Sequence, residues 1–231
     1  MIKLEHTDVY GFEVAVRGMR NPMNSWDKSD SGYVDCENYN GVDCKSECPY
    51  GHFCKESPYW HYNIGENDLA LMRKLAHAGD DHGKFARFIN VTVDITAPLY
   101  WWKEADTYKV GTVSNSCSTM HKIHEKEFSV DDFSHEHLGK NPTVFLLETI
   151  RALNVARREF LETKDKKYWW YLIQLLPSSY NQRRTVQLNY QVLNRIYHAR
   201  KNHKLDEWHE FCVWVEKLPY FKEIYLGGED D

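Results

Sequence analysis

The chain has 231 residues, of which 42% are hydrophobic and 14% aromatic, enough apolar material for the core of one large domain. Its formal net charge of −5 argues against broad, non-specific binding of a nucleic-acid polymer. The first residues contain no basic stretch followed by an apolar run, and no apolar stretch is long enough to span a membrane. We therefore expect a cytoplasmic protein that does not span a membrane.

The N-terminal part begins with strand-like and loop-like patterns. Residues 1–20 alternate loosely between apolar and polar side chains and predict one or two strands. Residues 21–62 are rich in Asn, Asp, Ser, Gly and Cys without periodicity, which predicts a long loop or insert. A helix follows, which Asn67 or Asp68 could cap and which ends at Gly79.

The middle of the chain predicts a strand, a helix and a loop. Residues 85–98 are rich in β-branched and aromatic side chains and end at a proline, which is typical of a strand. Residues 99–109 have a helical pattern. The small polar side chains of residues 110–121 predict a loop.

The second half has a strongly helical pattern. Apolar residues at helical spacing run from Pro142 to a basic end at Arg158, and further helices are predicted over 166–176, 181–199 and 205–217. Strands come first and helices last, which predicts an α+β fold with a small antiparallel sheet and a helical half. We expect one domain over residues 1–231, with a Cys-rich insert at about 21–62.

A group of cysteines in this insert is a candidate metal site. Cys36, Cys44, Cys48 and Cys54 could supply the four thiolates of a tetrahedral zinc site, and the metal would hold a polar segment together. Seven, three and five residues separate them, which matches no standard pair of zinc-binding cysteines. A loop with four reduced thiols is an equal alternative.

A group of arginines late in the chain is a candidate anion site. Arg183 and Arg184 follow a helix-ending proline, and Arg195 and Arg200 lie on the predicted helix over 181–199. Because 17 residues, nearly five helical turns, separate Arg183 from Arg200, the two could point to one side and share a phosphate or a pyrimidine ring. Taken alone, solvated surface arginines are the simpler interpretation.

The loop from Lys109 to His121 is a further candidate. Its small side chains and hydroxyls could bring backbone N–H groups close to an anion, although a capped loop between two helices would look the same. Cys117 is conceivable as a nucleophile, but no ordered partner for it is visible in the sequence. His82 follows the predicted helix end, where a lone histidine is more often structural than catalytic.

These features occur in the order found in flavin-dependent thymidylate synthases. That family has a helix ending in Ala-Gly-His-x-Ser, a strand ending in Ala-Pro and an Arg-His-Arg-x-x-Ser-x-Asn-Glu-x-Ser-x-Arg-Tyr signature. A Leu-Pro pair follows, with an arginine six residues after the proline. The segments LAHAGDDH, VTVDITAP and WWKEADTYKVGTVSNSCSTMH occupy the first three places, and LLPSSYNQRRTVQLNYQVLNRIYHARKNHKLDEW the last. The chain resembles this family over about residues 68–222.

The resemblance implies a function and a set of site residues. The function is reductive methylation of dUMP to dTMP, with methylenetetrahydrofolate, reduced FAD and NADPH, in a homotetramer. Ser118 and Arg200 would act at the reacting nucleotide, which Arg183, Arg200, Ser116 and Ser118 would bind. The residues facing the flavin would be His82, Lys109, Thr112 and Asn189.

The chain also departs from the family signature. Arg-His-Arg is replaced by Thr107-Tyr108-Lys109, the glutamate position holds Ser116, and the final Arg-Tyr is replaced by Met120-His121. Lost guanidinium groups weaken phosphate binding. Two alternatives therefore stay open: flavin-dependent modification of another pyrimidine nucleotide, and a non-catalytic nucleotide-binding or scaffold protein.

Overall fold

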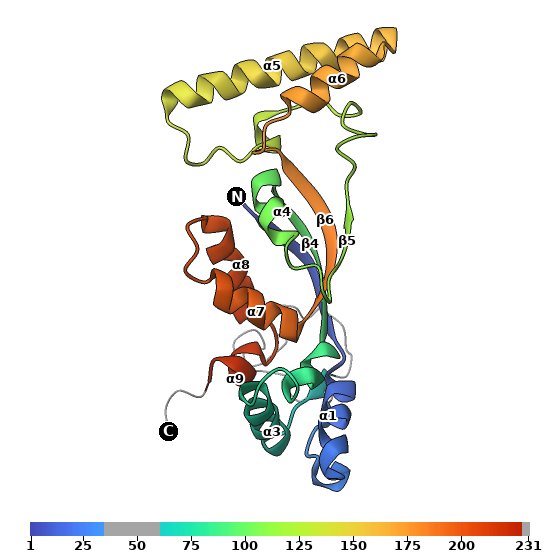
Figure 1. Cartoon of the computed structure of the whole chain (residues 1–231), viewed down its shortest axis with the longest axis vertical. Coiled ribbons are helices and arrows are strands. Elements are labelled where there is room, and N and C mark those ends of the chain that lie inside the picture. The colour runs from blue at the N-terminus through green and yellow to red at the C-terminus, as the bar shows by residue number, and fades with distance from the viewer. Residues whose placement is uncertain (35–60, 228–231) are drawn as a thin grey trace. The chain divides into compact units, whose positions relative to one another are not determined.

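The structure is a computed structural model that describes residues 1–34 and 61–227 (Figure 1). Its fold is α+β with a small antiparallel sheet, as the sequence predicts. The four-stranded sheet has the strand order β1–β4–β6–β5, and a second sheet pairs β2 with β3. The helices and strands are β1 (Lys3–Tyr10), α1 (Phe12–Arg20), β2 (Gly32–Val34), β3 (His61–Asn63), α3 (Glu66–His77), β4 (Asn90–Pro98), α4 (Leu99–Ala105), β5 (Val113–Ser116), α5 (Lys140–Thr163), α6 (Lys166–Leu175), β6 (Asn181–Asn189), α7 (Tyr190–Arg200), α8 (Asp206–Glu216) and α9 (Phe221–Tyr225).

The chain forms two compact units, which are described separately below. Unit 1 consists of Met1–Glu5, Asp94–Thr107 and Ser114–Thr185. Unit 2 consists of His6–Val93, Tyr108–Val113 and Val186–Asp231. One domain over the whole chain stays a prediction, and most of the expected insert lies outside the described residues. Among the helices that the structure describes, none is both long and apolar enough to cross a membrane.

A helical hairpin dominates unit 1. The helices α5 and α6 lie side by side (Figure 1), close to the bounds that their apolar spacing predicts. Asp165 caps α6 by accepting a hydrogen bond from the backbone N–H of Lys167 at 3.0 Å. The buried face of the hairpin packs against the preceding loop in one apolar cluster, which consists of Ile123, Phe128, Phe133, Leu146, Ile150, Leu153, Ala156 and Leu172. Burying each large side chain stabilises the unit by about 1.5–3 kcal/mol.

The side chain of Asn154 fastens this loop to α5. Its Oδ1 accepts from the backbone N–H of Phe128 at 2.9 Å, and its Nδ2 donates to the Phe128 carbonyl at 2.8 Å. Arg157 donates from Nε to the carbonyl oxygen of His124 at 2.9 Å. These bonds satisfy backbone groups that would otherwise lose water when the loop packs on the helix.

In unit 2, the prediction of one or two strands over residues 1–20 is wrong for the second half, which is α1. Phe12, Ala15, Val16 and Met19 are buried at helical spacing. Gly11 begins the helix with a φ of 101°, and a Cβ on it would lie 2.0 Å from the carbonyl oxygen of Phe88. Only glycine fits there, so the positive φ and the close backbone approach set the start of α1.

The prediction of a helix over 181–199 is wrong for its first half, because residues 181–189 form β6. Val186 and Leu188 are buried in strand-like alternation, and the helix α7 begins only at Tyr190. Asn189 caps it, accepting at Oδ1 from the backbone N–H of Val192 at 3.1 Å. Arg183 is therefore on a strand, and the five helical turns expected between it and Arg200 do not exist.

The start of α3 also differs from the expectation that Asn67 or Asp68 caps it. The side chain of Asp30 accepts from the backbone N–H groups of Asn67 at 2.9 Å and Asp68 at 3.0 Å. Asp68 is fully buried and its carboxylate accepts from Arg20 Nε at 2.6 Å. Hydrogen bonds from the side chains of Ser29 and Ser31 complete the cluster. This buried ion pair ties the loop before β2 to α3.

Smaller differences complete the comparison of sequence and fold. Residues 113–116 form the strand β5 where a loop is predicted, and α9 was not predicted. The helices α3, α4 and α8 are confirmed. The strand predicted over 85–98 begins only at Asn90, because the short 3₁₀ helix η4 (Gly83–Arg87) precedes it.

Candidate functional site

Arg200, the last residue of α7, packs against aromatic side chains in unit 2. Its Nε donates to the hydroxyl of Tyr108 at 2.8 Å. Its guanidinium carbon lies 4.9 Å from the ring centroid of Trp208 and 5.5 Å from that of Tyr108. The two rings meet edge to face with centroids 6.2 Å apart. We call Tyr108 and Trp208 the arginine clamp, because cation–π contacts and one hydrogen bond fix the guanidinium group.

The segment that carries Tyr108 also contacts the other end of α7. Gly111 has a φ of 78°, and a Cβ on it would lie 3.1 Å from Asn189 Nδ2 and from Val192 Cγ2. Asn189 is therefore a helix cap and a neighbour of this loop. The Oγ1 atom of Thr112 is buried and has no hydrogen-bond partner among the described residues. An unpaired buried hydroxyl is costly, which points to a polar ligand group that would pair with it.

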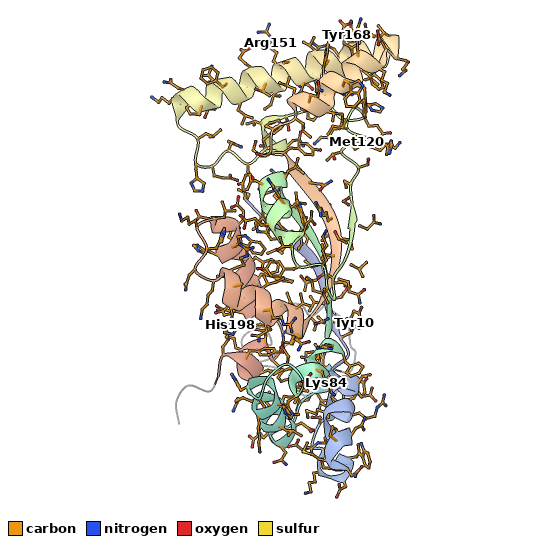
Figure 2. The ribbon with its side chains drawn as sticks, in the orientation of Figure 1. Tyr10, Lys84, Met120, Arg151, Tyr168 and His198 are labelled. Atoms are coloured by element: carbon orange, nitrogen blue, oxygen red, sulfur yellow. The ribbon has the colours of Figure 1, made fainter. Side chains whose placement is uncertain are left out.

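A cavity of about 890 Å³ lies between α1, α3 and η4 in unit 2. Its walls are mainly apolar, and cationic or titratable side chains lie among them; lining residues include Gly18, Met19, Leu75, His82, Lys84, Phe85, Arg87 and Phe88. Figure 2 labels Lys84 beside the ribbon of η4. Predominantly apolar walls with a few polar groups are typical of small-molecule sites.

A hydrogen-bond network connects this cavity with the start of α7. Arg87 donates from Nε to the side-chain oxygen of Gln191. Gln191 donates in turn to the backbone and side-chain oxygens of Asp80, both at 3.3 Å, and Arg195 also pairs with Asp80. His82 sits in the same turn, where its backbone N–H donates to the Gly79 carbonyl at 3.1 Å. The cavity wall and α7 are thus joined through polar side chains.

Arg183, in unit 1, is held by a carboxylate. Its Nη2 lies 2.6 Å from Asp94 Oδ2, and the hydroxyl of Thr185 donates to the other oxygen of Asp94 at 2.5 Å. The hydrogen bond to Asp94 and the attraction of that charge raise the pKa of Arg183. With 45% of its side chain exposed, Arg183 can exchange this partner for an anionic ligand at small cost.

Arg184 points to the other face of the strand in unit 1. It pairs with Asp106 at 2.7 Å, and its guanidinium carbon lies 4.1 Å from the ring centroid of Trp102. The alternation of side chains along a strand separates it from Arg183. Arg184 therefore has a packing role, and the two adjacent arginines do not form one fork.

Of the serines of the altered signature, both in unit 1, Ser116 is exposed and Ser118 is half-buried. Ser116 ends β5, and the hydroxyl of Ser118 accepts from the backbone N–H groups of Met120 at 3.3 Å and His121 at 2.9 Å. Ser118 thus closes a turn, and a ligand would have to compete for its hydroxyl. Cys117, between the two serines, is exposed and free.

Five of the residues expected in a site lie in unit 2: Arg200, His82, Lys109, Thr112 and Asn189. The other three, Arg183, Ser116 and Ser118, lie in unit 1. Cys36, Cys44, Cys48 and Cys54 lie outside the described residues, so zinc there stays a prediction. Within residues 1–34 and 61–227, no group of three His, Cys, Asp or Glu side chains is placed to hold a metal ion.

Sequence reasoning missed the partners of both arginines, Tyr108 and Asp94. In the sequence, Tyr108 is noticeable only because it replaces the histidine of the family signature. Asp94 is noticeable only as a residue of a predicted strand. The alternation of Asp94 between buried Val93 and Ile95 places its side chain on the polar face of β4, and this signal was available.

The fold is similar to that of known thymidylate synthases. Two crystal structures of thymidylate synthase X from Helicobacter pylori, each with FAD and dUMP, resemble it over 97% of both chains. Their TM-scores are 0.65 and 0.62, and each is 14% identical in sequence. No protein-family model matches the sequence, and no curated protein matches it.

Proposed function

We propose that this chain is a flavin-dependent thymidylate synthase, which converts dUMP to dTMP by reductive methylation. In this proposal methylenetetrahydrofolate donates the carbon, FAD is the cofactor and NADPH the reductant. The Helicobacter pylori proteins of similar fold hold FAD and dUMP, and the similarity extends over almost the whole chain. The spacing of Arg183, Asn189 and Arg200, which agrees with the family pattern, also supports the proposal.

The observation that carries the proposal is the cavity beside His82. Its volume of about 890 Å³ and its apolar walls fit a flat heteroaromatic ring. Lys84 and Arg87 outnumber Asp81 in the lining and would favour the negative charge of a reduced flavin or a phosphate. Outside this cavity, the buried hydroxyl of Thr112 is a further polar group that a ligand could satisfy. The lining of this cavity fits the cofactor, and of the residues expected to face the flavin it includes His82.

The chain's own residues would act by binding and orientation. Reduced FAD, when bound, supplies the hydride. Arg200 would hold the nucleotide and polarise the pyrimidine ring, because a guanidinium group donates charge-assisted hydrogen bonds to phosphate or carbonyl oxygens. Arg183 would release Asp94 to bind the nucleotide. No enzyme nucleophile is needed, so positioning and electrostatics account for the role of the protein.

The homotetramer of the proposal is supported by the α5–α6 hairpin. A groove of about 640 Å³ runs between the two helices, with apolar walls that include Val155 and Leu175. Arg151 and Tyr168, both labelled in Figure 2, also line it. The acids Glu148 and Glu159 accompany Arg151, so the rim carries both signs of charge and can match a second copy of itself.

Glutamate substitutions in this groove test the assembly. Val155→Glu or Leu175→Glu should reduce the mass measured by sedimentation, because a charge would have to be buried between copies. The matched control is Val213→Glu, at a valine of unit 2 that is 50% exposed, against 44% for Val155. Equal masses for all the variants and the wild-type protein would contradict the assignment of this face.

A second candidate, modification of a cytosine nucleotide, is favoured by Asp94. A carboxylate accepts a hydrogen bond from the exocyclic amino group of cytosine, whereas uracil has an oxygen there. Asp94 lies beside Arg183, which is assigned to the nucleotide. If this candidate is correct, the nucleotide base approaches Asp94 and the reaction uses dCMP.

Turnover assays with dUMP and dCMP, under the same folate, FAD and NADPH conditions, test both candidates. We expect a methylated product from dUMP. Product from dCMP alone would favour the second candidate. If neither nucleotide binds and neither yields product, both candidate functions are wrong.

A further inference from the structure

The arginine clamp goes beyond the residues that the family resemblance assigns. Tyr108 occupies the position of the histidine in the family signature, and the resemblance assigns no role to it. In this chain its hydroxyl receives the Nε–H of Arg200 at 2.8 Å, from a residue 92 positions away. The altered signature therefore supplies a contact to the arginine assigned to the nucleotide.

The indole of Trp208 and the turn between α7 and α8 are both held in place near Arg200. The side chain of Trp208 is buried, with 1% of its surface exposed, and its ring packs against that of Phe211 at 5.6 Å. The backbone N–H of His203 donates to the Arg200 carbonyl at 2.9 Å, and the imidazole of His203 accepts from the backbone N–H of Leu205 at 3.2 Å. The turn between α7 and α8 thus fixes the indole ring relative to the end of α7.

The loop that carries Tyr108 is anchored at the other end of the same helix. Gly111 contacts Asn189 and Val192 at the start of α7, and Tyr108 contacts Arg200 at its end. The loop therefore runs along the helix in the opposite direction. A ligand that orders this loop at Thr112 and a ligand that binds Arg200 would act on one short segment of chain.

We propose that Tyr108 is a positioning residue that, with Trp208, fixes the plane and direction of the Arg200 guanidinium group for nucleotide binding. This inference rests on the proposed function. Arginine loses rotamer freedom when it binds a ligand, and a side chain already held in its bound orientation loses less. The clamp compensates in this way for the cationic groups missing from the signature.

Calorimetric titration of dUMP into matched variants tests the clamp. Tyr108→Phe keeps the ring and removes only the hydroxyl, so it should weaken dUMP binding about tenfold, the usual loss for one hydrogen bond to a charged group. The control is Tyr197→Phe. It removes a hydroxyl on α7 that donates to Glu216 at 2.8 Å, and should leave dUMP affinity unchanged.

A double-mutant cycle separates positioning from general stability. Arg200→Lys places a methylene where Nε donates, so Tyr108 loses its donor. Tyr108→Phe should then cost about tenfold in the wild-type background and less than about twofold in the Arg200→Lys background. An equal loss in both backgrounds would mean that the hydroxyl acts on the fold and would overturn the clamp.

The outcomes distinguish the clamp from the function. If wild-type protein binds dUMP and Arg200→Lys weakens binding while Tyr108→Phe does not, the clamp is wrong and the proposed function stands. If the wild-type protein binds no dUMP, the proposed function fails, and the role of the clamp fails with it.

Discussion

Two arginines assigned to the same kind of ligand are held in different ways in the two units. Arg200, in unit 2, lies against a buried indole and a tyrosine hydroxyl. Arg183, in unit 1, pairs with Asp94 and has 45% of its side chain exposed. Aromatic packing fixes a guanidinium group in place, whereas an exposed ion pair contributes little and breaks readily.

A similar contrast separates one buried ion pair of unit 2 from one partly exposed ion pair of unit 1. In unit 2, Arg20 and Asp68 form a pair whose side chains are 5% and 0% exposed. In unit 1, Arg184 pairs with Asp106, whose side chain is 50% exposed. We infer that the surroundings of Arg200 hold it in one orientation, whereas Arg183 can exchange its partner.

The largest expected effect is on the buried pair of unit 2. Asp68→Ala leaves Arg20 buried without its partner and should lower the free energy of unfolding by about 3–5 kcal/mol. The matched change in unit 1, Asp106→Ala, should cost less than about 1 kcal/mol. Urea unfolding followed by circular dichroism gives both values, and equal losses would break the contrast between the units.

The next largest effect is on dUMP affinity, and it should differ between the two arginines. Arg200→Ala should weaken dUMP binding by at least about a hundredfold, because the clamp then has no cation to present. Arg183→Ala should cost about tenfold, since binding must first separate Arg183 from Asp94. Calorimetry measures both. If Arg183→Ala lost more dUMP affinity than Arg200→Ala, Arg183 and not Arg200 would be the main nucleotide-binding arginine, which would contradict this account.

A pH effect follows from the buried carboxylate of unit 2. Burial alone would raise the pKa of Asp68, but hydrogen bonds from Ser29, Ser31 and Arg20 outweigh it and lower the pKa. Because the pKa is lower in the folded state, this group stabilises the fold above the pKa of an unfolded aspartate, about 3.9. That stability is lost as the pH falls through the folded-state pKa.

Urea unfolding at a series of pH values measures this dependence. The free energy of unfolding of the wild-type protein should fall as the pH falls below about 4, and the Asp68→Asn variant should show a flatter dependence. Parallel pH curves for the two proteins would mean that Asp68 titrates alike in the folded and unfolded chains.

The smallest effect concerns the partner of Arg183. Asp94→Asn removes the charge that competes with an anionic ligand, so dUMP affinity should rise, by less than about fivefold. For dCMP the same change removes an acceptor for the amino group, and its affinity should fall if the second candidate is correct. Titration of both nucleotides into this variant measures the two changes.

The sequence predicted the elements whose apolar residues have one clear period. The helices α5, α6 and α8 bury residues at helical spacing, and their patterns were sufficient. Residues 12–20 have apolar side chains that fit both periods, and in the structure Phe12, Ala15, Val16 and Met19 are buried at the helical one. At β6, a helix cap at Asn189 separates two patterns that look continuous in sequence.

The site could be predicted only in part. Arg183 and Arg200 were assigned to the site because their spacing resembles that of the family. Their partners, Asp94 and Tyr108, lie 89 and 92 residues away in the chain. Pairs so distant depend on how strands and helices pack, which no local pattern records. The role of Asp68 was missed for the same reason, because its partner Arg20 lies 48 residues earlier.

The absorption spectrum of the purified full-length protein tests the central claim most directly. The account predicts the bands of oxidised flavin or, if the cofactor is lost on purification, a melting temperature that rises when FAD is added, because a ligand of the folded state stabilises it. A colourless protein whose melting temperature does not change with FAD would contradict the assignment of the cavity beside His82 and the function proposed from it.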